Sequence, residues 1–217
     1  MNSTNEFNLF VEPDAPIEVN LIVTCYDKEE YLFGFLECIK EYKYIIPNVC
    51  LCYNGTLHGF PSDIKLTNQG HQLGDISLTL AGYACLKNNG VSRFLKLGID
   101  SWLMDDSIIY KIFRSMSQSK SAYAGNYWFA ENTPSLSTDI IFADLNFGNI
   151  FEKFEWDGRF FETSLYTTIL KNKLKISFIQ ERIPVEPENR FECSSLKWTM
   201  EHDLKKNLIN FWKYKER

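Results

Sequence analysis

The acidic residue Asp100 ends a mostly apolar run over 93–99 and is soon followed by Asp105 and Asp106. In a chain of mixed helices and strands, this pattern predicts a buried strand that places a carboxylate at the carboxyl edge of a sheet. A carboxylate there can hold a hard divalent cation against the diphosphate of a nucleotide. The same residues also fit a structural interpretation, in which Asp100 caps a turn and the later acids begin a helix near Ser107.

Two other predicted strands and a glycine-bearing loop should meet at the same edge of the sheet. The first strand ends in groups suited to a nucleoside, and the second ends in an amide that can bond a base or a ribose. Glycine in the loop lets the backbone approach a ligand closely. Each feature is weak alone, and Gly70-x-x-x-Gly74 is neither a Rossmann fingerprint nor a P-loop. The candidate nucleotide-binding residues are Thr24, Tyr26, Asp27, Asn54, Gly70, His71, Gly74 and Asp75.

Hydrophobic periodicity predicts the elements that position these residues. Residues 19–26 and 49–53 are apolar strands, and 28–42 carry apolar residues at helical spacing, which makes a βαβ unit of a parallel sheet. Helices and strands continue to alternate along the chain. The sequence therefore predicts an α/β fold with three α/β/α layers and a mostly parallel sheet. The further predicted elements are strands at 64–66, 91–97, 121–128, 139–142 and 175–179 and helices at 76–86, 106–117, 145–154, 161–170 and 200–214.

Length and composition indicate one domain over 1–217, with a loose lead-in at 1–17 and a C-terminal helix at 198–217. The chain has 217 residues, of which 45% are hydrophobic, enough for a real core. A net charge of −5 argues against a nucleic-acid partner. No signal peptide or membrane-spanning stretch is evident. The six cysteines have neither zinc-ligand spacing nor disulfide-scaffold density, so we expect a reduced, cytoplasmic protein.

Taken in order, these segments resemble the nucleotide-sugar glycosyltransferases of GT-A fold (a Rossmann-like nucleotide-binding fold), especially the inverting, family-two-like kind. The resemblance runs from about Val19 to Asp203. Residues 21–32 resemble the strand and loop that hold the nucleoside, and 68–74 resemble the family's glycine loop. Residues 96–100 lie where the family carries its Asp-x-Asp metal motif. The chain departs from that motif because its first acid position is a glycine.

Two later positions extend the resemblance. Phe161-Glu162-Thr163 resembles the acidic motif that supplies the family's catalytic base, with Thr163 in the place of the aspartate. The resemblance makes Glu162 the candidate base. It also implies a divalent cation, Mn²⁺ or Mg²⁺, held by Asp100 and His202. The structural alternatives are that Glu162 is an acid favoured by a helix N-terminus and that His202 is a packing or surface residue.

The function implied by the resemblance is metal-dependent transfer of a sugar from a nucleotide-diphosphate sugar to an acceptor hydroxyl, with inversion. Glycan or surface polysaccharide synthesis, with a glycan or lipid-linked acceptor, is the expected setting. One alternative is a non-catalytic nucleotide-sugar or carbohydrate-binding domain, favoured by Gly98. A second is a sugar nucleotidyltransferase, although 24–28 lacks the glycine- and lysine-rich loop such an enzyme needs. The basic residues of 201–217 suggest peripheral membrane contact, or else a packed helix with a solvated face.

Overall fold

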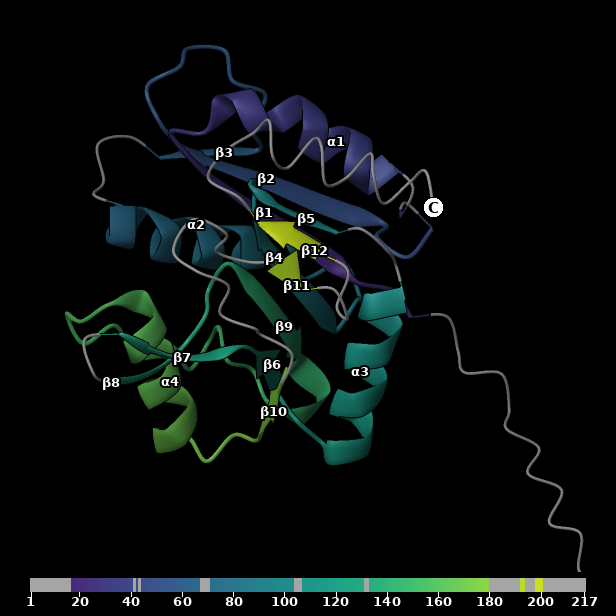
Figure 1. Cartoon of the computed structure of the whole chain (residues 1–217), viewed down its shortest axis with the longest axis vertical. Coiled ribbons are helices and arrows are strands. Elements are labelled where there is room, and N and C mark those ends of the chain that lie inside the picture. The colour runs from purple at the N-terminus through teal and green to yellow at the C-terminus, as the bar shows by residue number, and fades with distance from the viewer. Residues whose placement is uncertain are drawn as a thin grey trace, which may run out of the picture.

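The structure of the protein is a computed structural model that describes residues 17–40, 42, 44–66, 71–103, 107–130, 133–179, 192–193 and 198–200 (Figure 1). Several predictions fall outside these residues: the lead-in up to residue 16, Gly70, His202 and residues 201–217 of the C-terminal helix. The helix predicted from residue 198 is wrong at its start, because Trp198–Met200 form a strand. None of the helices in the described ranges combines the length and the apolar character that crossing a bilayer requires.

A seven-stranded sheet lies at the centre of the fold, in the order β10-β6-β9-β4-β1-β2-β3. Neighbouring strands are parallel except where β9 pairs with β4 and with β6, so the prediction of a mostly parallel sheet is confirmed. The strands are β1 (Asn20–Tyr26), β2 (Asn48–Asn54), β3 (Ile64–Leu66), β4 (Arg93–Gly98), β6 (Tyr123–Gly125), β9 (Ile140–Asp144) and β10 (Ile176–Phe178).

Helices cover both faces of this sheet, which confirms the three-layer α/β/α architecture (Figure 1). Leu21 and Val23 of β1 share one core with α1 (Leu32–Lys40), which follows a short 3-10 turn η1 (Glu29–Tyr31), and with α3 (Ser107–Ser119). Ile22, which points to the opposite face, shares the second core with α2 (His71–Leu86) and α4 (Phe161–Lys171). The alternation of side chains along β1 therefore supplies both cores from one strand.

Two smaller sheets flank the central one. β5 (Ser101–Leu103) pairs with β12 (Trp198–Met200), which pairs in turn with β11 (Glu192–Cys193). β7 (Tyr127–Ala130) and β8 (Thr133–Leu136) form a separate antiparallel pair. The single strand predicted at 121–128 is therefore wrong, because β6 ends at Gly125 and β7 belongs to another sheet.

Two other predictions need correction. The loop expected to run to Asp75 is already helical from His71, and glycine is useful there because a Cβ on Gly74 would overlap the amide nitrogen of Asn54. The helix expected at 145–154 is only a short 3-10 turn, η2 (Leu145–Phe147). That turn ends at Gly148, whose φ of 144° belongs to a conformation that favours glycine.

Gly82 lets α2 pack closely on the sheet, and this contact can be tested. A Cβ at this position would lie 2.6 Å from Ile22 Cγ2 and 3.0 Å from Cys52 Sγ. Gly82→Leu should lower the free energy of unfolding by about 2 kcal/mol, because overpacking outweighs the better helix propensity of leucine. Urea denaturation measures this loss. The matched control is Ala84→Leu at an exposed position of α2, which should change stability by less than about 0.5 kcal/mol. Equal stability of the two variants would contradict the packing argument.

Candidate functional site

A pocket lies at the carboxyl ends of β1 and β4 and extends to the amino end of α4. It encloses about 580 Å³, part of which is open to solvent. The sheet register explains its position, because Thr24 of β1 lies beside Gly98 of β4 and both strands end there. The charged side chains that line it are Lys28, Asp75, Lys96, Asp100, Asp139 and Glu162.

The pocket brings together five of the residues singled out from the sequence: Thr24, Tyr26, Asp75, Asp100 and Glu162.

The other predicted residues do not line the pocket or are not described. Asn54 is buried at the end of β2, in register with Tyr26, and packs on Gly74. Asp27 is exposed and has a φ of 46°, so it forms a turn after β1. His71 begins α2, and only its backbone is described. Gly70 and His202 lie outside the described residues.

Asp100 is held in a turn directly after β4. The Ile99 amide donates to the Thr24 carbonyl at 2.9 Å, which ties this turn to β1. The Asp100 side chain is only 7% exposed and forms an ion pair with Lys28. A Cβ on Gly98 would lie 2.9 Å from Asp100 Oδ1, so the absence of a side chain at residue 98 gives this carboxylate its room.

Two lysines of the pocket were missed by the sequence reasoning. Lys96 lies within β4 with its side chain 3% exposed, and its Nζ donates to the Thr138 carbonyl at 2.6 Å and lies 3.0 Å from Asp75 Oδ1. A lysine is almost never buried unless it is paired, so its place in the apolar run of β4 was a usable signal. Lys28, which follows β1, gave a weaker signal in the sequence, because only the folded structure shows that its side chain contacts Asp100.

Asp139 and Glu162 are half-buried acids on the side of the pocket opposite β1. Burial raises the pKa of Asp139, although Lys96 acts in the other direction, and burial also raises the pKa of Glu162. Glu162 Oε1 accepts a hydrogen bond from Thr138 Oγ1 at 3.1 Å, whereas its Oε2 is buried with no hydrogen-bond partner among the described residues. Carboxyl groups of this kind suit proton transfer near neutral pH.

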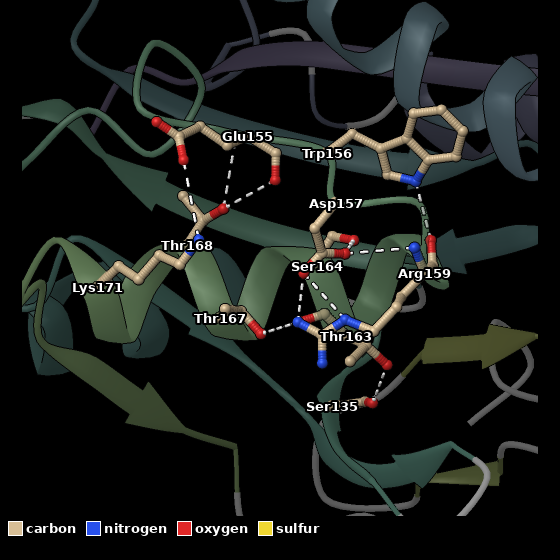
Figure 2. Close-up of polar contacts among 10 residues, drawn as sticks. All are labelled: Ser135, Glu155, Trp156, Asp157, Arg159, Thr163, Ser164, Thr167, Thr168 and Lys171. Atoms are coloured by element: carbon tan, nitrogen blue, oxygen red, sulfur yellow. Dashed lines mark hydrogen bonds and ion pairs between the residues drawn. The ribbon is translucent and has the colours of Figure 1, made fainter.

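The amino end of α4, which carries Glu162, is anchored by side chains on the turn before it (Figure 2). Asp157 accepts hydrogen bonds from Ser164 Oγ at 2.6 Å and from Arg159 Nε at 2.9 Å. Arg159 also donates to Thr167 Oγ1 at 2.7 Å. The hydrogen bonds that Asp157 accepts, above all the one from the Arg159 side chain, hold the pKa of Asp157 below its usual range.

The neighbouring hairpin supports the same helix from another side (Figure 2). Thr163, which stands where the resemblance would place an aspartate, is buried and shares a hydrogen bond of 2.8 Å with Ser135 of β8. It therefore attaches α4 to the β7–β8 hairpin. Glu162, the neighbouring residue, is positioned both by this hairpin and by the turn before α4.

The described residues do not fit a divalent cation by themselves. Among them, no group of three or more His, Cys, Asp or Glu side chains is placed to hold a metal ion. Asp100 has an ammonium as its partner, and position 98 offers no oxygen ligand. A divalent cation prefers several oxygen ligands, so this donor set is insufficient. The prediction that Asp100 and His202 bind a metal together stays a prediction.

The fold defined by this sheet and pocket is the GT-A fold of nucleotide-sugar glycosyltransferases, which nucleotidyltransferases share. The catalytic domain of Drosophila β1,4-galactosyltransferase 7, in complex with xylobiose, is similar at a TM-score of 0.52 and 12% identity over 88% of this chain and 73% of that one. Mannosyltransferase PcManGT from Pyrobaculum calidifontis, in complex with GDP-Man and Mn²⁺, is similar at a TM-score of 0.53 and 10% identity over 76% of this chain and 55% of that one.

A cytidylyltransferase from Leptospira borgpetersenii is similar at a TM-score of 0.47 and 15% identity over 82% of this chain and 79% of that one, a likeness too low to bear on function. No protein-family model and no curated protein matches the sequence. The resemblance predicted from sequence is thus confirmed at the level of the fold.

The raised pKa of Asp139 predicts a pH dependence of stability. In the ordinary range of aspartate, near pH 4, the unfolded chain releases a proton that the folded protein still holds. The contribution of Asp139 to stability is therefore present at low pH and is lost as the pH rises through the raised pKa.

Urea denaturation from about pH 4 to about pH 8 tests this dependence on pH. Asp139→Asn keeps an oxygen to accept the hydrogen bond of Ser137 Oγ but does not titrate, so its stability should fall less over this range than that of the wild type. Glu37→Gln, which removes an exposed carboxylate on α1, should keep the wild-type pH dependence. Parallel curves for the wild type and Asp139→Asn would contradict the argument.

Proposed function

We propose that this chain is a glycosyltransferase that moves a sugar from a nucleotide-diphosphate sugar to an acceptor hydroxyl. The observation that carries this proposal is one pocket at the carboxyl edge of a GT-A sheet, with the end of β1 on one side and a half-buried acid on the other. Thr24 and Tyr26 end β1 on the first side, and Glu162 stands at the start of α4 on the second. A transferase needs both sides, since it must hold a donor and activate an acceptor.

In this mechanism the nucleoside lies over the end of β1 and the diphosphate lies near Asp100 and Lys28. Glu162 takes the proton of the acceptor hydroxyl, and the acceptor oxygen bonds to the anomeric carbon. The bond between that carbon and the phosphate oxygen breaks, and the nucleoside diphosphate leaves with the electron pair. Attack from the face opposite the leaving group inverts the anomeric carbon.

The surroundings of Glu162 support its role as the base. Thr138 fixes one carboxylate oxygen, and the second is buried with no hydrogen-bond partner among the described residues, so its capacity to accept a proton is unmet. Burial raises the pKa of Glu162 and makes it a stronger base than an exposed glutamate. The acid limb of the pH–rate profile should accordingly lie above the ordinary pKa of glutamate.

The cysteines support a cytoplasmic setting, where glycan or surface polysaccharide synthesis would draw on nucleotide sugars. Five cysteines are free thiols: Cys25, Cys38, Cys50, Cys52 and Cys85. The sulfur atoms of Cys50 and Cys52 lie 3.6 Å apart. Free thiols at such a distance suit a reducing compartment. A glycan or lipid-linked acceptor and membrane contact by residues 201–217 remain proposals based on the sequence.

A non-catalytic binding domain is the second candidate. Gly98 favours it, because residues 98–100 hold one acid where the Asp-x-Asp motif of the family that this chain resembles has two. Turnover separates the two functions. A transferase should release nucleoside diphosphate slowly from its donor even without an acceptor, whereas a binding domain should bind the donor and release none.

Donor binding is the first test of the proposed function. In a thermal-shift screen of UDP- and GDP-sugars, at least one should raise Tm, because a ligand at a hundredfold excess over its Kd stabilises the native state by about 2.7 kcal/mol. Free glucose and galactose, which lack the nucleotide, are the matched controls and should give no shift. The proposal fails if no nucleotide sugar shifts Tm in the presence or absence of Mn²⁺.

Loss of the base is the second test. Glu162→Gln should reduce turnover by about 100-fold or more, since a positioned general base contributes that much, and the glutamine can still accept the hydrogen bond of Thr138. Glu155→Gln, at an exposed residue on the turn before α4, is the control and should keep wild-type turnover. Donor turnover with the acceptor present, followed with the unfolding midpoint, measures both variants. Equal turnover of the wild type and Glu162→Gln would remove Glu162 from the mechanism.

A further inference from the structure

We propose that the Lys28 ammonium bridges Asp100 and the donor diphosphate, in the place of a divalent cation, so that nucleoside diphosphates bind this chain without a metal. The inference rests on the proposed function, because it assigns a ligand group to the same pocket. It goes against the metal dependence implied by the family resemblance, and it follows from how residues 98, 100 and 28 meet.

The first step is the geometry of the motif itself. Asp100 Oδ1 lies 2.9 Å from the position of a Cβ on Gly98, so a side chain at residue 98 would push this carboxylate away. Asp100 Oδ2 is bound by Lys28 Nζ. The glycine therefore allows Asp100 to sit close to β4 while its other oxygen faces an ammonium.

The second step is the backbone that presents Lys28. Asp27 adopts a φ of 46°, which turns the chain directly after β1. The Lys28 amide donates to the Cys25 thiol, and the Lys28 carbonyl accepts from the Tyr31 amide at 3.2 Å. The backbone of Lys28 is thus fixed on both sides. Its side chain is still 30% exposed, so the ammonium can contact a ligand.

The third step is the chemistry of the ammonium. A lysine has three N–H donors, and one of them suffices for the bond to Asp100. A phosphate oxygen in the pocket, which Lys28 lines, can accept from the same ammonium, so Lys28 can link a carboxylate to a diphosphate, as a bridging cation would.

The fourth step is the charge of the surrounding pocket. Lys96 is already held by Asp75 and by the Thr138 carbonyl, so those groups are compensated. A divalent cation at Asp100 would instead lie within a few ångströms of the Lys28 ammonium, and that repulsion in a partly buried site is costly.

Calorimetric titration of UDP and of GDP tests the inference. The wild-type protein should bind one of them with similar affinity in EDTA and in Mn²⁺. Lys28→Met should weaken that binding in EDTA about tenfold or more, as expected for loss of a hydrogen bond between charged groups. Lys28→Arg, which keeps the charge, should retain most of the affinity. Lys40→Met, which removes an exposed lysine of α1 paired with Glu37, should bind as the wild type does.

The outcomes separate this inference from the proposed function. Binding by the wild type only when Mn²⁺ is present would overturn the role of Lys28 and leave the transferase proposal intact. Equal affinity of Lys28→Met and the wild type in EDTA would also overturn it. Failure of both nucleotides to bind under either condition would contradict the proposed function and this inference with it. The wild-type titrations need no variant, so poor folding of Lys28→Met would not prevent a decision.

Discussion

Parallel pairing of β1 with β2 on one side and with β4 on the other fixes the edge of the sheet at which the pocket lies. Tyr26 lies beside Asn54, and Thr24 lies beside Gly98, so three strands end at one edge. A shift of one residue in this register would exchange the two faces of β1 and dismantle both cores. The requirements of packing and of the site are therefore met by the same hydrogen-bonded ladder.

Charged side chains gather in the pocket, and contacts from other elements of the fold compensate the buried ones. Lys96 is buried on a central strand and is held by α2 through Asp75 and by the segment before β9 through Thr138. Removing one partner of such a buried pair is costly, because the other charge is left without compensation. Thr138 also bonds Glu162 through its hydroxyl, so α2, β4, the segment before β9 and α4 are linked through one short chain of contacts.

Local pattern predicted most of the fold. The apolar run of β1 and the helical spacing of 161–170 identified a strand and a helix that the structure contains within one or two residues. Gly74 misled the prediction, because glycine marks a loop in most sequences, whereas here it removes a clash between a helix and the Asn54 side chain. The helix predicted at 145–154 failed because Asp144 bonds the Asn146 amide and Gly148 takes a positive φ.

The candidate site was only partly predictable. Asp100 and Glu162 could be found because each follows a strong local signal, the end of an apolar run and the start of a helix. The pairing of Lys28 with Asp100 spans 72 residues, and that of Lys96 with Thr138 spans 42. Contacts over such separations depend on strand order and helix placement, which hydrophobic periodicity leaves open.

The Asp157 turn has a consequence for how this protein can change over evolutionary time. Asp157 and Arg159 of this turn form hydrogen bonds with Ser164 and Thr167 of α4, the helix that follows. The turn therefore supports the start of α4 (Figure 2). Surface residues around the mouth of the pocket can then be exchanged while the position of the carboxyl group is preserved. Such a division lets the lining of the pocket vary in descendants of this chain without a change in the turn that supports α4.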